Sequence, residues 1–315
     1  MALPQPRFAM PGTIAPLPSC SIAFSPMAPQ RSGALFAFLA YAIWGLFPLY
    51  FKQLKGVDAF EVIAHRTLWS LLVLLLVLAV MRRWAWLPVA LKNRKLVATS
   101  ALSALLLSAN WLVYVWAVQN GHVVESSLGY FINPLVSVAL GFVVLRERPR
   151  FGQWLAVAVA AAGVLWLALG AGHVPWISLV LAFSFGFYGL MRKTATLGAL
   201  EGLTLETMIL APIAAVALTL WCVQGTSPLV RGDAGLIAWL LAAGPLTAIP
   251  LLLFASGARR ITMMLLGLLQ YIAPTLQFAI GVGVYGEPMS GPKLVGFCII
   301  WAALAIYSIE GLRRR

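Results

Sequence analysis

The sequence predicts an all-α integral membrane protein whose ten transmembrane helices form two inverted five-helix repeats. Three observations support this prediction: the apolar composition, the distribution of lysine and arginine, and a pattern that occurs twice. Apolar residues make up 62% of the 315 residues and charged residues only 10%, which leaves too little polar surface to cover a soluble globule of this size. Most side chains are therefore expected to face lipid or the protein interior.

Ten apolar stretches give the predicted helices. Each is long enough, or nearly so, to cross a hydrocarbon core of about 30 Å at about 1.5 Å per residue. They cover approximately 34–51, 60–81, 96–118, 125–145, 152–170, 174–191, 203–223, 235–257, 263–285 and 292–309. The loops between them are short, so no separate soluble domain is expected.

The two ends of the chain differ from these apolar stretches. Residues 1–32 hold seven of the nineteen prolines and lack a helical period, and this composition predicts a disordered N-terminal tail. Residues 311–315 form a short basic C-terminal tail.

Lysine and arginine predict the orientation, because positively charged loops are retained in the cytoplasm. With a cytoplasmic N-terminus, ten crossings place seventeen of these residues inside, four outside and Arg66 within a helix. The inner group includes Lys92 in one loop and Arg192 with Lys193 in another. Both termini are therefore expected in the cytoplasm. The net charge of +13 reflects this topology and an attraction to anionic lipid, and it does not indicate a nucleic-acid partner.

The repeated pattern recurs after 140 residues. Pro134 and Glu147 bracket one apolar helix, and Pro274 and Glu287 bracket another with the same thirteen-residue interval. With five helices in each copy, the second copy must enter the membrane from the opposite side, which makes the two copies an inverted pair. The predicted boundaries are 33–172 for the first repeat and 173–310 for the second. A weaker similarity also pairs Glu61 with Glu206 at the start of equivalent helices.

Polar side chains in the two repeated helices lie on equivalent faces. They stand at i, i+4 and i+7, which is one stripe of a helix, and they are Tyr130, Pro134 and Ser137 in one copy and Gln270, Pro274 and Gln277 in the other. Each proline also removes a backbone donor and frees the carbonyl four residues earlier. Two facing stripes of this kind predict a substrate site between the repeats. The alternative is that these groups only join helix to helix by hydrogen bonds.

The second predicted helix carries charged residues near its outer end. Glu61 and His65 are four residues apart and share a face, and Arg66 follows directly. One interpretation is that Arg66 extends to the interface while Glu61 and His65 cap the helix. The other is that this cluster binds an anion or handles protons at the outer mouth of a cavity, because an arginine inside a membrane is costly unless it faces a cavity or the interface.

Glu147 and Glu287 are expected at membrane surfaces on opposite sides. Acidic side chains stabilise helix N-termini, so each is expected to cap the helix that follows it. A role in coupling is the alternative.

The candidate substrate cavity comprises the aromatic, amide and charged side chains within the predicted helices. These residues are Trp44, His65, Arg66, Asn110, Tyr114, Tyr130, Asn133, Tyr188, Gln270 and Gln277. The sequence contains no Walker motif, no paired carboxylates, and no histidine and cysteine residues at metal-ligand spacing. The three cysteines are scattered. No catalytic residue, cofactor or metal is therefore expected.

Residues 33–310 resemble the drug/metabolite transporter superfamily with two EamA-type repeats, and more narrowly its RarD-like proteins, which are often labelled chloramphenicol-sensitive. The segments that carry the resemblance are AYAIWGLFPLYFK at 40–52, AHRTLWS at 64–70, NGHVVESSLGYFINPLVSVALG at 120–141, FGFYGLMRK at 185–193, GLTLET at 202–207 and QYIAPTLQF at 270–278. The resemblance implies a ten-helix inner-membrane permease whose central cavity is lined by both repeats. The N-terminal tail has no counterpart in it.

The expected function is secondary transport of a small amphipathic metabolite or drug across the bacterial inner membrane by alternating access, with export as the expected direction. The alternative is an intramembrane enzyme or a translocase that acts on lipid-linked substrates. Proton coupling and facilitated diffusion both remain open. The expected partners are a small-molecule substrate and the lipid bilayer, in a monomer or a homodimer.

Overall fold

A computed structural model of the chain describes residues 29–119, 123–169, 176–284, 286 and 291–312. Within these residues the regular structure consists of fourteen α-helices and no strand. The helices are α1 (Pro29–Gly45), α2 (Phe47–Gln53), α3 (Ala59–Val80), α4 (Trp86–Lys92), α5 (Arg94–Gln119), α6 (Val123–Val143), α7 (Phe151–Leu169), α8 (Trp176–Thr194), α9 (Ala199–Val223), α10 (Pro228–Arg231), α11 (Ala234–Ala258), α12 (Met263–Gln270), α13 (Ile272–Gly283) and α14 (Gly291–Leu312).

All ten predicted stretches contain helix, and α4 and α10 are short additional helices between them. Five segments of the described chain are long and apolar enough to cross a membrane: Gln30–Gln53, Ala59–Val80, Arg94–Ala117, Ala199–Val223 and Ala234–Ala258. Shorter apolar helices lie at Gly129–Val143, Phe151–Trp166, Met263–Gln277 and Leu294–Tyr307. The fold is therefore that of an all-α membrane protein, and the number of ten crossings stays a prediction.

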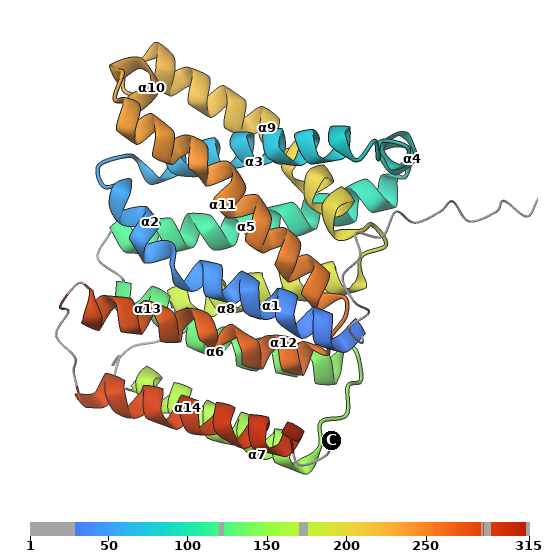
Figure 1. Cartoon of the computed structure of the whole chain (residues 1–315), viewed down its shortest axis with the longest axis vertical. Helices are drawn as coiled ribbons and strands as arrows, with labels where there is room; N and C mark the ends of the chain where they lie inside the picture. The colour runs from blue at the N-terminus through green and yellow to red at the C-terminus, as the bar shows by residue number, and fades with distance from the viewer. Residues whose placement is uncertain (1–28, 120–122, 170–175, 285, 287–290, 313–315) are drawn as a thin grey trace, which may run out of the picture.

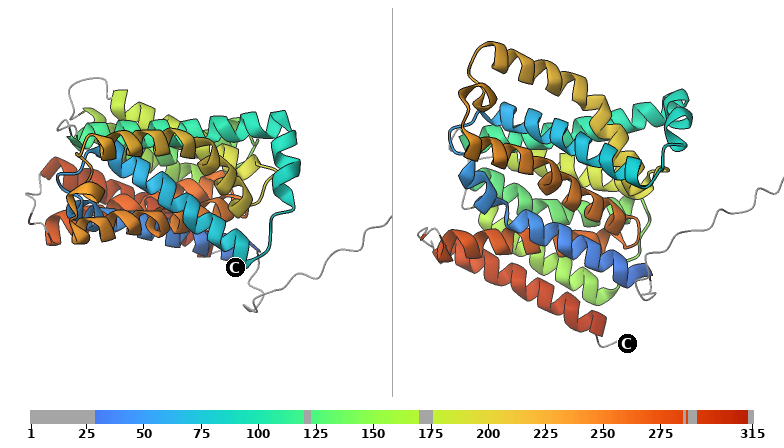
Figure 2. Two further views of the ribbon diagram at one scale, coloured as in Figure 1. Left: turned by 90° about the horizontal axis from the view of Figure 1, so that it is seen from above. Right: turned by 45° about the horizontal axis from the view of Figure 1, so that its top comes forward.

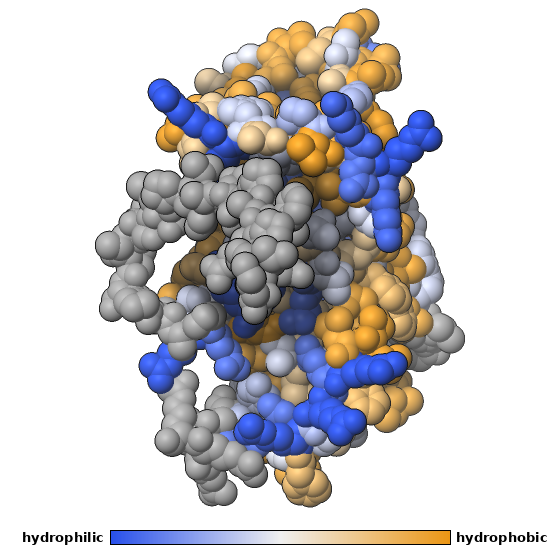
Figure 3. Space-filling model, turned by 90° about the vertical axis from the view of Figure 1, so that its right-hand side faces the viewer, coloured by the Kyte–Doolittle hydropathy of each residue, from blue (hydrophilic) through white to orange (hydrophobic). Residues whose placement is uncertain are grey.

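The outward surface of the helices fits a lipid environment. Leu76 is 63% exposed on α3 and Ile213 is 70% exposed on α9, although both are large and apolar. Figure 3 shows the face at which α1 begins, where hydrophilic side chains project around the rim and apolar side chains cover much of the flanks. This division is expected of a bundle whose sides contact lipid and whose ends contact water.

The first helix begins earlier than predicted. α1 starts at Pro29, so the prediction of a tail through residue 32 is wrong for its last four residues, and residues 1–28 lie outside the described part. Proline suits the first turn of a helix, where its missing N–H would have no partner. Gly33 lets this turn approach the loop after α11, since a Cβ there would lie 2.5 Å from the Cβ of Arg260.

Two predicted helices are broken in the middle. The first divides into α1 and α2 around Leu46, and the ninth divides into α12 and α13 around Tyr271. Pro48 and Pro274 follow the two breaks, and each lacks the N–H that would continue the ladder of backbone hydrogen bonds. In each half of the chain, one backbone carbonyl near the break therefore lacks its partner within the helix.

Four pairs of corresponding helices start 140 residues apart. The pairs of first residues are Ala59 and Ala199, Arg94 and Ala234, Val123 and Met263, and Phe151 and Gly291. This constant offset pairs Glu206 with Arg66, whereas the sequence comparison paired Glu206 with Glu61. Equivalent positions seven residues into α3 and α9 thus carry opposite charges.

The helices of the two halves interleave. α6 packs against α8 and α12, α3 packs against α9 and α11, and α1 packs against α11 and α13. Figures 1 and 2 show α7 and α14 side by side at one edge of the bundle and α9 near the opposite edge. The beginning of α1 and the end of α14 lie at the same end of the helices in Figure 1.

The predicted topology has a direct test at two exposed positions. A cysteine at Gln224, just after α9, is expected to react with an impermeant thiol reagent added to intact cells. A cysteine at Lys92, at the end of α4, is expected to react only after the membrane is opened. The native cysteines are replaced by serine in both proteins. Labelling of the Lys92 variant in intact cells would overturn the orientation.

Candidate functional site

A cavity of about 50 Å³ lies among aromatic side chains near the middle of the bundle. We name it the aromatic cavity, and its lining residues are Tyr41, Trp44, Phe47, Phe51, Asn110, Trp111, Tyr114, Tyr130, Phe185, Gln270, Ala273, Pro274 and Gln277. These residues come from α1, α2, α5, α6, α8, α12 and α13. Both halves of the chain therefore form its wall.

The aromatic rings of this cavity contact one another mostly at tilted or perpendicular angles. The ring of Trp44 meets those of Tyr41 and Phe185 edge-on, with centroids 5.6 and 5.5 Å apart. Tyr114 and Tyr130 meet in the same way at 5.6 Å. Aromatic rings at these separations prefer edge-to-face contacts. The cavity can therefore receive a flat or apolar group against several ring faces and edges.

Amide side chains of the aromatic cavity are fixed by hydrogen bonds to other helices. Gln277 donates from Nε2 to the carbonyl of Trp44 at 3.2 Å, which is the carbonyl that loses its helical partner at Pro48. Asn110 donates from Nδ2 to the carbonyl of Leu181 at 2.9 Å and to Oγ of Ser184 at 3.0 Å. These amides join α13 to α1 and α5 to α8. They therefore line the cavity and also form hydrogen bonds between helices.

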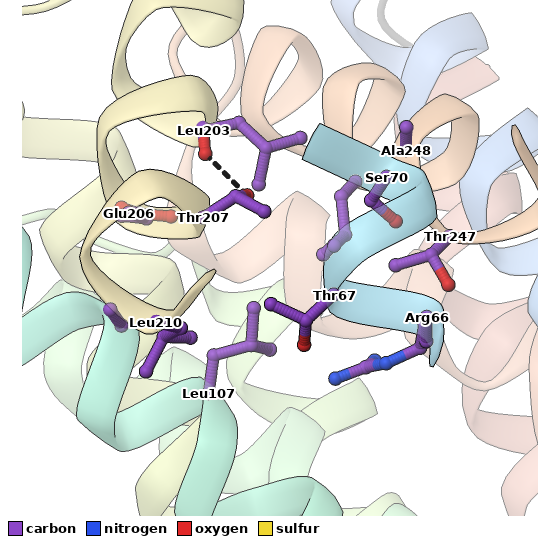
Figure 4. A pocket seen from close by; sticks show the side chains of 12 residues that line it. Arg66, Thr67, Ser70, Leu107, Leu203, Glu206, Thr207, Leu210, Thr247 and Ala248 are labelled. Atoms are coloured by element: carbon purple, nitrogen blue, oxygen red, sulfur yellow. Dashed lines mark hydrogen bonds between the residues drawn. The ribbon is translucent and has the colours of Figure 1, made fainter. Parts of the chain in front are cut away.

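A second, smaller cavity of about 30 Å³ lies between α3, α5, α9 and α11. We name it the polar cavity, and its polar lining residues are Arg66, Thr67, Ser70, Glu206, Thr207 and Thr247. Figure 4 shows Arg66 and Glu206 on opposite sides of this cavity. Its volume has room for one or two water molecules.

Arg66 is buried in the bundle. Its side chain is only 9% exposed, and its Cζ atom lies 4.1 Å from the ring centroid of Trp111. Among the described residues, its Nε and Nη1 atoms have no hydrogen-bond partner. The interpretation in which Arg66 extends to the membrane interface is therefore wrong, because the guanidinium turns inward onto an aromatic ring.

Glu61 and His65 do not cap α3. The N-cap of this helix is Asp58, whose side chain accepts from the backbone N–H of Phe60 at 2.9 Å. Glu61 is buried and lies 3.8 Å from Nε2 of His65, while Nδ1 of His65 accepts from Trp69 at 3.0 Å. An aspartate directly before the helix competes better for its first N–H groups than a glutamate inside it.

A buried ion pair joins α8, α9 and α5. Arg192 donates from Nη1 to Oε1 of Glu206 at 3.1 Å, and Ser103 donates to the same oxygen at 2.7 Å. The two charged side chains are 2% and 3% exposed. The prediction that Arg192 lies in a cytoplasmic loop is wrong, since it forms part of the protein interior. Gly202 makes room for it, because a Cβ there would collide with the guanidinium.

The sequence reasoning did not find this ion pair. One signal was present, the glycine of GLTLET four residues before Glu206, because a glycine leaves room for a large side chain. The 140-residue offset pairs Glu206 with Arg66 and does not point to Arg192.

Glu147 binds the N-terminus of a helix in the other half of the chain. Its carboxylate accepts from the backbone N–H groups of Met263 at 2.8 Å and Met264 at 3.3 Å. Lys193 lies 3.9 Å from the same carboxylate and donates to the carbonyls of Ala258 and Ile261. The prediction that Glu147 caps the following helix is therefore wrong: it caps α12. Glu287 lies outside the described residues.

Seven of the ten predicted site residues line a cavity. Trp44, Asn110, Tyr114, Tyr130, Gln270 and Gln277 line the aromatic cavity, and Arg66 lines the polar cavity. His65, Asn133 and Tyr188 line neither, although all three are buried. The ring of Tyr188 stacks instead on Phe254, with centroids 5.9 Å apart. No group of three or more metal-ligating side chains gathers within the described residues.

Comparison with known proteins gives consistent matches. Residues 31–169 match the model of the EamA-like transporter family. The protein RarD of Streptomyces exfoliatus is 48% identical, with 90% of both chains covered. The protein RarD of Escherichia coli is 43% identical, and an uncharacterized transporter of Pseudomonas aeruginosa is 44% identical; each match covers 90% of this chain and 95% of the relative.

A solved crystal structure shares the fold. It superposes with a TM-score of 0.68 over 91% of this chain and 99% of the other, at 19% identity. The identity of the relatives and the length of their matches determine the family. The chain belongs to the EamA-like transporter family, as a RarD-like multi-pass membrane protein.

Proposed function

We propose that this protein is a secondary transporter that moves a small amphipathic solute through the aromatic cavity by alternating access. The observation that carries the proposal is the composition of the wall, which combines rings with fixed amides from both halves of the chain. Sites for small molecules are lined mainly by apolar and aromatic groups with a few placed polar ones. Membership of a transporter family supports the same conclusion.

The volume of the aromatic cavity supports a closed conformation. A cavity of about 50 Å³ is small beside the roughly 300–1,000 Å³ of ordinary ligand pockets. A solute can therefore enter only when the two halves move apart on one side. Five-helix units of opposite orientation, at 33–172 and 173–310, would rock against each other around this site.

The contacts of Glu147 and Lys193 form the closure at one end of the proposed path. They tie the loop after α6 to the start of α12 and the ends of α8 and α11. The contacts of Glu147 with the start of α12 and with Lys193 cross between the two halves, so they must break when the cavity opens at this end. The bonds of Lys193 to the end of α11 stay within the second half. The distribution of lysine and arginine predicts that this end of the path faces the cytoplasm.

The remaining features of the proposal follow from the sequence. The protein is proposed to lie in the bacterial inner membrane with both termini in the cytoplasm, to act as an exporter, and to work as a monomer or a homodimer. It is proposed to bind a small-molecule substrate and lipid, with no nucleic-acid partner and no enzymatic activity. The lack of a nucleotide-binding motif favours a gradient as the energy source.

Efflux from proteoliposomes tests the proposal. Vesicles that contain the purified protein are loaded with a bacterial metabolite extract, and the external medium is followed by mass spectrometry. At least one solute is expected to leave faster than from empty vesicles and with unchanged mass. The Gln270→Leu variant is expected to slow this efflux, while the Leu76→Ala variant on the lipid-facing side of α3 is not. Products of altered mass would support an intramembrane enzyme instead.

A further inference from the structure

Arg66 is a buried cation that has no anionic partner among the described residues. An unpaired charge in a protein interior costs several kcal/mol, and most buried charges are paired for this reason. Its side chain is only 9% exposed, and its Nε and Nη1 atoms have no hydrogen-bond partner among the described residues. Trp111 interacts with the charge through its ring, at 4.1 Å from Cζ. This contact uses no N–H donor, so the fork of the guanidinium is available to a ligand.

Neither Glu206 nor Glu61 forms an ion pair with Arg66. Glu206 lies across the polar cavity, and its Oε1 atom accepts from both Arg192 and Ser103. Glu61, about one turn before Arg66 on α3, lies 3.8 Å from Nε2 of His65, and no hydrogen bond joins it to Arg66. Within the part of the chain that the structure describes, no acidic side chain therefore compensates the positive charge of Arg66.

Arg66 and Trp111 link the walls of the two cavities. Its side chain lines the polar cavity, and the ring of Trp111 beneath it lines the aromatic cavity. A ligand with its apolar body among the rings can therefore reach the guanidinium with a charged end. Arginine recognises planar oxyanions through paired N–H donors, which a lysine cannot do.

We propose that Arg66 binds the carboxylate of the transported solute, and that the substrate is an amphipathic organic monoanion whose apolar body occupies the aromatic cavity. This inference rests on the proposed transport function and names its substrate class. A single negative charge is favoured because Arg66 offers one positive charge, while the other buried guanidinium, that of Arg192, is already paired with Glu206. A neutral solute of the same shape leaves the arginine unpaired and binds more weakly.

Equilibrium binding to the purified protein tests the inference without any transport assay. The probes are a series of ω-phenyl monocarboxylates with chains of two to six carbons, each with its neutral primary amide, together with phenyl phosphate. Titration calorimetry in lipid nanodiscs measures their affinities. At least one carboxylate is expected to bind about tenfold or more tightly than its amide, since charge-assisted hydrogen bonds are roughly twice as strong as neutral ones.

Three variants identify the side chain that recognises the negative charge of the ligand. Arg66→Gln is expected to abolish the preference for carboxylate over amide, and Arg66→Lys to reduce it. Trp111→Leu is expected to weaken all the probes. The comparison of each carboxylate with its amide in the parent protein remains decisive if a variant does not fold.

Several results would overturn the inference. These are equal binding of carboxylates and amides, absence of binding by every carboxylate, or an unchanged preference in Arg66→Gln. If phenyl phosphate binds more tightly than every carboxylate, the assignment of a carboxylate substrate is wrong and a phosphorylated solute is indicated instead. The proposed function is tested separately. Selective binding of a carboxylate without release of any solute from vesicles would support the carboxylate site and contradict the transport function.

Discussion

The Arg192→Met variant is expected to lose about 3–5 kcal/mol of its free energy of unfolding. Removal of the guanidinium leaves the carboxylate of Glu206 buried, with Ser103 still donating to it. The carbonyls of Gly198 and Ala199 also lose a donor, Nη2 of Arg192. Reversible unfolding in mixed detergent micelles, followed by circular dichroism, measures the loss.

Two further variants separate this ion pair from a general effect of charge. The double variant with Arg192→Met and Glu206→Leu removes both charges and is expected to recover most of the lost stability, because apolar replacements of buried pairs are often neutral or better. Lys92→Met removes an exposed cation at the end of α4 and is expected to change little. Equal losses for Arg192→Met and Lys92→Met would contradict the buried pair.

The Gly267→Val variant is expected to lose about 1–3 kcal/mol of stability by overpacking. A Cβ at this position would lie 2.7 Å from the carbonyl oxygen of Pro134 and 3.2 Å from the Cβ of Ser137. The substitution therefore forces α12 away from α6, where the two halves of the chain meet. The midpoint of thermal unfolding of the solubilised protein and the rate of efflux from vesicles are both expected to fall.

Gly283→Val provides the matched control for this prediction. Gly283 is the last residue of α13, and a Cβ there would meet no atom of the described residues within 4 Å. The two substitutions share the same change in side chain, so their difference isolates the steric contact. Equal stability of the two variants would show that α6 and α12 do not approach as closely as described.

Periodicity predicted the helices and much of the aromatic cavity. Apolar stretches of membrane length leave the chain few alternatives to helix, because backbone groups in lipid must bond within the segment. Tyr130, Gln270 and Gln277 were found because they lie at helical spacing around two prolines. The spacing of residues along the sequence was sufficient to find these side chains, because each polar stripe belongs to a single predicted helix.

Partners that are distant in sequence could not be predicted. Glu147 caps a helix that begins 116 residues later, and Arg192 turns inward from the last turn of α8. A charge rule that counts lysine and arginine places Arg192 in a loop, because it takes no account of the carboxylate on α9. His65 and Asn133 lie on predicted helices, but packing turns them away from both cavities.

Thiol accessibility at Gln270 and Gln277 tests most directly the claim that the aromatic cavity is a transport path. In a chain with Cys20, Cys222 and Cys298 replaced by serine, a cysteine at either position is treated with a hydrophilic, impermeant reagent. The reagent is added to intact cells and, separately, to inverted membrane vesicles. A cysteine at Leu76, exposed toward lipid, is the negative control. Alternating access predicts labelling of positions 270 and 277 from both sides of the membrane and none at position 76. Labelling from neither side, or from one side only, would contradict it.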